Sequence, residues 1–250
     1  MREFRPLGNT IFPPVVKNLL IINGIMFLAA NVFGSSLGVD LNRLLGLYYF
    51  ESPNFRVWQF FTHLFMHGNM MHIFSNMLAL WMFGSVIENY LGSKRFLQYY
   101  IITGLGAAFL HLGVQFVEVQ LLKEQLSAAT INEVLSNGAS VVAQHMNYAD
   151  PQAAAYTAAL FFPTVGASGA VFGLLLAFGM LFPNALIYLY FLLPIKAKYF
   201  VILYGLFELY SGFANNPGDN VAHFAHLGGM LFGYILIKVW RIRKAGDYFM

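Results

Sequence analysis

The sequence has no cysteine and few charged residues. Without cysteine, the chain of 250 residues can form no disulfide, no thiolate nucleophile and no cysteine-based metal site. Only 10% of its residues are charged and 58% are hydrophobic, whereas a soluble domain carries about 25% charged residues. The composition therefore predicts an all-α integral membrane protein. No hydrophilic stretch is long enough for a second domain, so we expect a single membrane-embedded domain over residues 1–250.

Six apolar segments approach the roughly 20 residues that cross a bilayer as a helix. They are residues 18–37, 70–88, 96–117, 166–182, 197–213 and 221–240. The apolar run 186–193 is too short to span and ends at Pro194, so we expect an interfacial approach to the fifth helix. Residues 118–165 mix apolar and polar positions, which indicates one or two amphipathic surface helices or a poorly ordered loop.

The basic residues predict the orientation of these segments. Eleven of the 14 Lys and Arg residues fall at the N-terminus, after the second and fourth segments, and at the C-terminus. They are Arg2, Arg5, Lys17, Lys94, Arg95, Lys196, Lys198, Lys238, Arg241, Arg243 and Lys244. Basic loops stay in the cytoplasm, so both termini are expected there and 118–165 outside. The net charge of +3 reflects this bias, and no nucleic-acid partner is expected. A signal peptide is the alternative for the first segment, and its cleavage would leave the other helices oriented as before.

Polar residues recur at one depth of this arrangement. Ser168 opens the fourth segment within Gly166-Ala-Ser-Gly169, His72 and Asn76 open the second, and His226 opens the sixth. All three segments start on the outer side, so the four side chains lie within roughly 10 Å of the outer interface. A buried hydroxyl needs a partner, because an unpaired one costs roughly 1–3 kcal/mol. Serine, histidine and amide groups together indicate acyl-transfer chemistry.

Two glycine pairs predict how these helices meet. Gly169 and Gly173 are four residues apart, as are Gly229 and Gly233, and such pairs let helix backbones approach closely in lipid. Gly229 and Gly233 share a helix face with His226. A crossing on these glycines would bring Ser168 and His226 within hydrogen-bonding distance.

These motifs resemble those of the rhomboid family of intramembrane serine proteases, in the family's order from about residue 55 to 235. They are His63-Leu-Phe-Met-His67, His72-Ile-Phe-Ser-Asn76, Glu88-Asn-Tyr-Leu-Gly92-Ser93, Gly166-Ala-Ser168-Gly169 and Ala225-His226-Leu-Gly-Gly229-Met-Leu-Phe-Gly233. The resemblance implies a six-transmembrane-helix bundle of the bacterial type, with its core at about 55–240 and a long outer loop at 118–165. It also implies a serine–histidine pair without an acid, in which Ser168 is the nucleophile and His226 the general base. His223 also follows an alanine, but only His226 has glycines three and seven residues later.

The remaining roles follow from the chemistry of a serine nucleophile. A neutral imidazole takes the serine proton, and fixed donors must stabilise the oxyanion. The candidate donors are the side chains of His72 and Asn76 and the backbone N–H of Ser168. Gly166 is expected to bend the backbone toward the cavity, and Gly169 to let the sixth helix approach.

Packing rather than an acid is expected to orient the base. Phe172, one turn after Ser168, is placed to stack against His226. The nearest acids are Asp219 and Glu208, and local hydrogen bonding or gating is the favoured role of Glu208. His63 and His67 are expected to be structural or to line the cavity.

The sequence thus predicts a serine endopeptidase that cuts within or near transmembrane segments. Its expected partners are membrane lipids and transmembrane substrates, which enter past the fifth helix, and neither a cofactor nor a metal is expected. Two alternatives stay open: a pseudoprotease that binds transmembrane clients, and a histidine-lined transporter or haem protein in which His63 and His67 are ligands. Lack of cysteine and the compact plan favour a bacterial cytoplasmic membrane.

Overall fold

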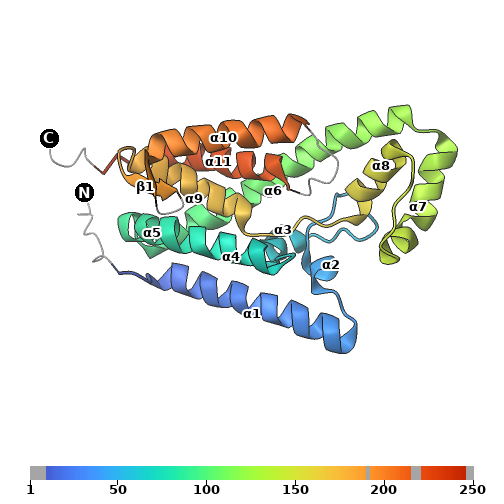
Figure 1. The fold of residues 1–250 in the computed structure, drawn as a ribbon, viewed down its shortest axis with the longest axis horizontal. Helices are drawn as coiled ribbons and strands as arrows, with labels where there is room; N and C mark the ends of the chain where they lie inside the picture. The colour runs from blue at the N-terminus through green and yellow to red at the C-terminus, as the bar shows by residue number, and fades with distance from the viewer. Residues whose placement is uncertain (1–9, 190–191, 215–220, 246–250) are drawn as a thin grey trace.

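The structure is a computed structural model that describes residues 10–189, 192–214 and 221–245. Within these residues the chain is mostly helical, with one short hairpin (Figure 1). The elements are α1 (Pro14–Leu37), α2 (Leu41–Leu45), α3 (Gln59–Thr62), the 3-10 turn η1 (His63–Phe65), α4 (Met70–Ala79), the π-helical turn η2 (Leu80–Gly84), α5 (Ser85–Leu91), α6 (Ser93–Gln125), α7 (Ala128–Ala143), α8 (Pro151–Phe161), α9 (Ser168–Leu181), β1 (Leu186–Leu189), β2 (Leu193–Lys196), α10 (Ala197–Ala214) and α11 (His223–Val239).

Each of the six predicted apolar segments coincides with a helix or a continuous helical run. Three of these are long and apolar enough to cross a membrane, namely α1, the run from Met70 to Leu91, and α6. Helices α9 and α11 are apolar but shorter. These helices support an integral membrane protein. That the chain crosses the membrane six times stays a prediction.

Helix α9 lies at the centre of the bundle, where it contacts α6, α10 and α11 (Figure 1). Ten of its 14 residues are buried, which follows from a sequence that is apolar or small on every side. The main core gathers around it and includes Phe172, Leu174 and Leu181 of α9 and Phe96 and Tyr99 of α6. The helix that begins with Ser168 is thus held from all sides.

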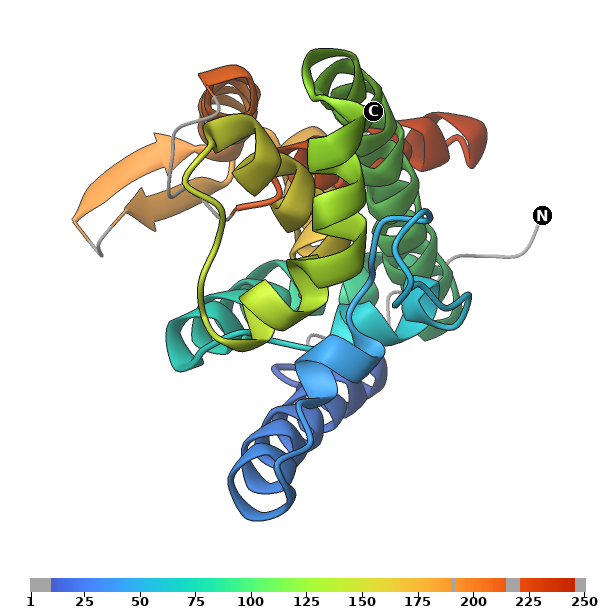
Figure 2. The ribbon, with the colours of Figure 1, turned by 90° about the vertical axis from the view of Figure 1, so that its right-hand side faces the viewer.

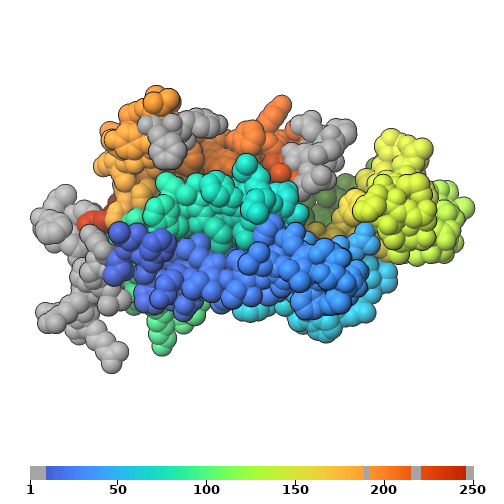
Figure 3. All heavy atoms as spheres, turned by 60° about the horizontal axis from the view of Figure 1, so that its bottom comes forward, coloured from blue at the N-terminus to red at the C-terminus, as the bar shows by residue number. Residues whose placement is uncertain are grey.

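Both ends of the described chain lie at the same end of the bundle, beside α5. Thr10 donates a hydrogen bond from its hydroxyl to Asn89, and the hydroxyl of Tyr90 donates to the carbonyl of Arg243. Helix α1 packs alongside α4 and α5 over one face (Figure 3). Arg2 and Arg5, used to predict the orientation, and Asp219, the predicted neighbour of the site, lie outside the described residues.

Helices α7 and α8 lie at the opposite end, which Figure 2 shows with these two helices in front. Buried Val134, Gly138 and Val142 recur every four residues on α7, which makes it amphipathic. Asp150 caps the start of α8 by accepting from the N–H of Ala153. The predicted loop 118–165 therefore contains two helices, of which α7 is amphipathic, but its first eight residues continue α6 instead, and the expected start at 118 is wrong.

The apolar run before α10 forms a structure that the sequence did not predict. Strands β1 and β2 pair antiparallel, with Leu186 opposite Lys196 and Leu189 opposite Leu193. The β-branched Ile187 and the aromatic Tyr188 suit a strand, and Pro194 lies in a two-stranded hairpin whose strands are both edges. The expected approach to the fifth helix is thus a hairpin, and its place at the membrane interface stays a prediction.

Candidate active site

Ser168 is the first residue of α9 and is presented by a bent backbone segment. Gly166 adopts φ +128°, a conformation that L side chains rarely adopt, and its N–H donates to the carbonyl of His63 at 2.9 Å. A β-carbon on Gly166 would lie 2.7 Å from Nε2 of His72 and 3.6 Å from Oγ of Ser168. Glycine is therefore required here on two counts, backbone conformation and space.

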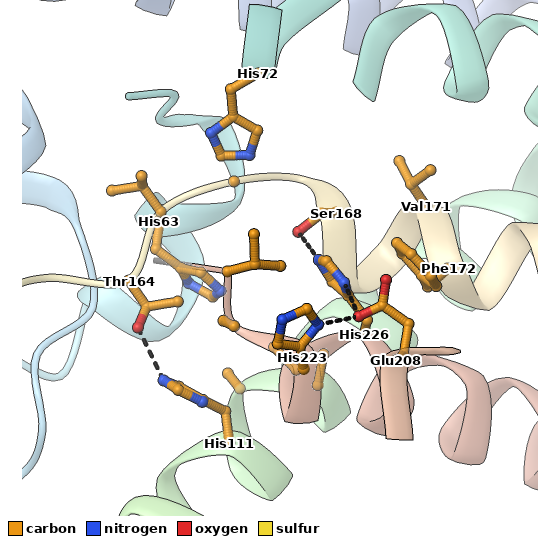
Figure 4. A pocket seen from close by; sticks show the side chains of 18 of the residues that line it. His63, His72, His111, Thr164, Ser168, Val171, Phe172, Glu208, His223 and His226 are labelled. Atoms are coloured by element: carbon orange, nitrogen blue, oxygen red, sulfur yellow. Dashed lines mark hydrogen bonds and ion pairs between the residues drawn. The ribbon is translucent and has the colours of Figure 1, made fainter. Parts of the chain in front are cut away.

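His226 of α11 faces Ser168 directly. Its Nε2 lies 2.9 Å from Oγ of Ser168, and the hydroxyl donates to this nitrogen if Nδ1 carries the ring proton (Figure 4). The ring of Phe172 stacks on the imidazole with centroids 4.0 Å apart and planes 6° apart. The serine and the histidine, 58 residues apart in sequence, are thus in hydrogen-bond contact on neighbouring helices.

The two predicted oxyanion donors lie on α4. His72 is half-buried, and its Nε2 and the hydroxyl of Ser168 flank the same small space beside Gly166. Asn76 is buried, and its side-chain amide donates to the carbonyl of His72 at 3.0 Å, which leaves its second N–H for another acceptor. The first N–H groups of α9 have no partner within the helix, so the N–H of Ser168 is available as a third donor.

The glycines of α9 and α11 act at two different contacts. A β-carbon on Gly229 would run into the backbone of Gly169, so α11 closes onto α9 at this glycine. A β-carbon on Gly233 would first meet the hydroxyl of Tyr99 on α6 and would lie 3.3 Å from the carbonyl oxygen of Gly173. A β-carbon on Gly169 or Gly173 would instead meet Ala107 or Thr103 of α6. The expectation that Gly169 makes room for α11 is therefore wrong in this detail, because its missing side chain makes room for α6.

Three further histidines lie near the site, and two of them line its cavity. His63 lines the cavity, and its Nδ1 donates to the carbonyl of Gln59 at 2.8 Å. His67 does not line it, but packs edge-on against His72 with ring centroids 5.0 Å apart. Burial lowers the pKa of both His63 and His67 to about 4, so both are neutral at pH 7. His111 of α6, which sequence analysis missed, bonds Oγ1 of Thr164 at 3.0 Å.

An acid contacts the histidine, contrary to the sequence-based expectation. Oε2 of Glu208 on α10 lies 2.9 Å from Nδ1 of His226 and 2.6 Å from Nδ1 of His223 (Figure 4). The expectation that packing rather than an acid orients His226 is therefore wrong. Hydrogen bonding was one of the two roles expected for Glu208, and the other, gating, stays a prediction. A carboxylate in an apolar helix was the available signal, but its partners lie on another helix.

A cavity of about 1550 Å³ surrounds these groups. Ser168, His226 and Glu208 line it together with His72 and Asn76, and it extends past His111 to the C-terminal half of α8. A cavity with polar side chains inside an apolar bundle gives water a path to a hydroxyl that would otherwise be isolated from it. The arrangement thus combines a hydroxyl, a base, oxyanion donors and space for water.

The same cluster has the residue types of a metal site. Glu208, His223 and His226 offer ligand atoms that all lie within 4.8 Å of one another. Both Nδ1 atoms, however, already share one carboxylate oxygen at hydrogen-bond distances. Hydrogen bonding satisfies the three groups without an ion, and the expected absence of a metal stays a prediction.

Comparisons with known proteins add the following similarities. The sequence matches the rhomboid domain family over residues 54–243. It is 30% identical over 233 residues to RHOMBOID-like protein 12, mitochondrial, of Arabidopsis thaliana, covering 92% of this chain and 59% of that protein. It is 43% identical over 51 residues to Rhomboid protease GlpG of Salmonella newport, covering 20% of this chain and 18% of that protein. The matched region thus spans less than two thirds of the length of these relatives.

Proposed function

Because the chain belongs to the rhomboid family, we propose that it is an intramembrane serine endopeptidase with Ser168 as nucleophile and His226 as general base. The observation that carries the proposal is the 2.9 Å contact between Oγ of Ser168 and Nε2 of His226 in a cavity within an apolar helix bundle. Serine is a weak nucleophile until an adjacent base takes its proton, and this pair meets that requirement.

The proposed reaction begins when Oγ of Ser168 attacks the carbonyl carbon of a peptide bond and its proton passes to Nε2 of His226. The side chains of His72 and Asn76 and the N–H of Ser168 donate to the resulting oxyanion. The C–N bond then breaks as His226 gives the proton to the leaving amine, which leaves an ester on Ser168. Water attacks the ester, again through His226, and Oγ recovers its proton as the acid product leaves.

The proposed substrates are transmembrane segments of other proteins, reached from the lipid past α10. The side chains of α10 support this route, because Ile202, Leu203, Leu206 and Phe207 are exposed and apolar, as a lipid-facing surface requires. A substrate helix must unwind locally to present a peptide bond, since a helical backbone engages its own carbonyls.

The proposed topology places both termini in the cytoplasm and the cavity toward the outer side. Nine of the eleven basic residues that predict it lie within the described chain, and Thr10 and Arg243 lie together at one end of the bundle. A bacterial cytoplasmic membrane stays the proposed location, although one relative is by its name mitochondrial.

The test is cleavage of a single-span substrate by purified protein in liposomes, together with labelling by a fluorophosphonate probe. We expect the wild type to cut and to be labelled at Ser168, and Ser168→Ala to do neither. Labelling or cleavage that persists in Ser168→Ala would refute the assignment of the nucleophile. An inactive wild type that still binds the substrate would instead favour the pseudoprotease alternative.

A further inference from the structure

Glu208 is an acid in the middle of an apolar helix. It is 2% exposed, while its neighbours on α10, Phe207 and Leu209, are exposed and apolar. A buried carboxylate is expensive to desolvate unless it is paired and hydrogen-bonded, and within spanning helices such groups mark functional sites. The partners of Glu208 should therefore indicate why it is there.

Both of its described partners are histidines of α11. His223 and His226 are three residues apart, so they share a helix face, and each directs Nδ1 at Oε2 of Glu208. A carboxylate can only accept hydrogen bonds, so both Nδ1 atoms carry protons and donate to it. Nε2 of His226 is then the nitrogen with the free electron pair, and it is this nitrogen that lies 2.9 Å from Oγ of Ser168.

We propose that Glu208 is a positioning residue that completes a Ser168–His226–Glu208 triad, with His223 as a second donor that holds the carboxylate in place. The proposal rests on the proposed function and deepens it. The carboxylate selects the ring tautomer in which Nε2 accepts the serine proton, and it stabilises the imidazolium that forms. The proton on Nδ1 stays on Nδ1, and Glu208 takes up no proton during the reaction.

Two side chains, Phe172 and Glu208, restrain different properties of the His226 ring. Phe172 stacks on the ring face and so restrains its plane, but a stack permits both tautomers and leaves the ring free to flip in that plane. The bond to Glu208 distinguishes Nδ1 from Nε2, which no apolar contact does. Glu208 is therefore expected to act on the chemical step rather than on substrate binding.

The experiment measures kcat and KM for cleavage of a single-span substrate by wild type, Glu208→Gln and Glu208→Asp across pH 5 to 10. Glutamine keeps the shape and loses the charge. In comparable triads, loss of the acid lowers kcat by roughly 10⁴-fold, and we expect Glu208→Gln to lose at least about 100-fold with KM unchanged. Glu208→Asp keeps the charge and should lie between the two.

The pH profile separates a role in the reaction from a structural role. Without the carboxylate, the imidazolium loses its proton more readily, so the acid limb of kcat/KM should move to lower pH in Glu208→Gln and stay nearer the wild type in Glu208→Asp. Glu133→Gln on α7, outside the cavity, makes the same chemical change and should leave kcat and the profile unchanged. The other titratable side chains that line the cavity around this pair are His63, His72, His111, Glu118, Tyr204 and His223.

The outcomes distinguish the two proposals. A wild type that does not cut, or a Ser168→Ala variant that does, refutes the proposed function. An active wild type with Glu208→Gln within about threefold of it and an unmoved acid limb refutes only the role of Glu208. Loss of wild-type activity in EDTA would also overturn it, in favour of a metal on the same three side chains.

A measurement on the wild type keeps the proposal testable if Glu208→Gln does not fold. In protein labelled with ¹⁵N-histidine, the proton of neutral His226 should reside on Nδ1 in the resting enzyme. A proton on Nε2 would contradict the proposal without any variant.

Discussion

Replacing Gly229 by alanine should separate the two reacting side chains. A β-carbon at Gly229 would overlap the carbonyl oxygen of Gly169 and lie only 2.7 Å from its carbonyl carbon, whereas ordinary contacts begin at 3.4 Å. The obstacle is backbone, which cannot rotate away as a side chain can. Helix α11 must therefore move away from α9 by at least 0.7 Å.

The size of this shift sets the expected loss of activity. His226 lies one turn before Gly229, and Ser168 directly precedes Gly169, so the shift acts on their 2.9 Å contact. Added to that contact, 0.7 Å gives about 3.6 Å, which is beyond the roughly 2.6–3.2 Å reach of a general base. A misplacement of about 1 Å costs about 100-fold in rate, and overpacking costs about 1–3 kcal/mol of stability. We expect activity to fall 10- to 100-fold in a protein that still folds.

The assay compares Gly229→Ala with Gly24→Ala, both measured by substrate cleavage and by thermal unfolding in detergent. Gly24 on α1 has no atom within 4 Å of where a β-carbon would lie, so alanine should be accepted there and should favour the helix. Gly229→Ala with activity within twofold of Gly24→Ala would refute the argument that backbone contact between α9 and α11 sets the distance of the pair.

Three further predictions follow from contacts elsewhere. Glu88 accepts hydrogen bonds from the N–H groups of Val15 and Val16 at 3.0 and 2.8 Å and from the hydroxyl of Ser93 at 2.7 Å. Glu88→Ala removes these bonds and should lower the free energy of unfolding by about 2–4 kcal/mol and expose α1 to protease. An unchanged melting temperature would contradict this. Because burial lowers the pKa of His67 to about 4, the unfolded chain binds more protons than the folded one between pH 6.5 and 4. Stability should therefore be full above pH 6.5 and decline toward pH 4, by at most about 3 kcal/mol from this group, and a melting temperature flat over that range would count against it. Phe172→Leu removes the stack on the imidazole but keeps an apolar side chain, so it should lower kcat about 10-fold with little loss of stability. A large fall in the melting temperature together with the fall in kcat would indicate a packing role instead.

The sequence predicted the helices of the bundle well because their signal is local. A run of about 20 apolar residues can satisfy its backbone in a bilayer only as a helix, so the positions of α1, α6 and α11 could be read directly. The hairpin at 186–196 was missed for the complementary reason. Its apolar run is too short to span, and its partner strand became apparent only from the pairing of Ile187 with Ile195.

The site residues that could be predicted are those with a recognisable pattern in the sequence next to them. Ser168 between glycines and His226 ahead of two spaced glycines could be identified, as could the shared helix face of His72 and Asn76. Glu208 and His111 could not be assigned, because their partners His223, His226 and Thr164 lie on other elements and no spacing along the chain connects them. Two side chains on different helices meet only if each helix is rotated to turn its side chain toward the other and both side chains lie at the same depth in the bundle. Sequence patterns mainly indicate which face of its helix a side chain occupies.

The imidazole of His226 is restrained in three ways, and each restraint has a different physical origin. Gly229 fixes the distance of its backbone to α9 by steric contact, Phe172 fixes the plane of its ring by stacking, and Glu208 fixes its tautomer by a hydrogen bond. The three act on different degrees of freedom, so none can substitute for another. Single substitutions at these positions should therefore each lower activity, and Gly229→Ala combined with Glu208→Gln should cost no more than the larger single loss, because a base already out of reach of Ser168 gains nothing from the correct tautomer. If the two increases in the free energy of activation add in the double variant, the two restraints instead contribute independently of each other, and the coupling argued here is refuted.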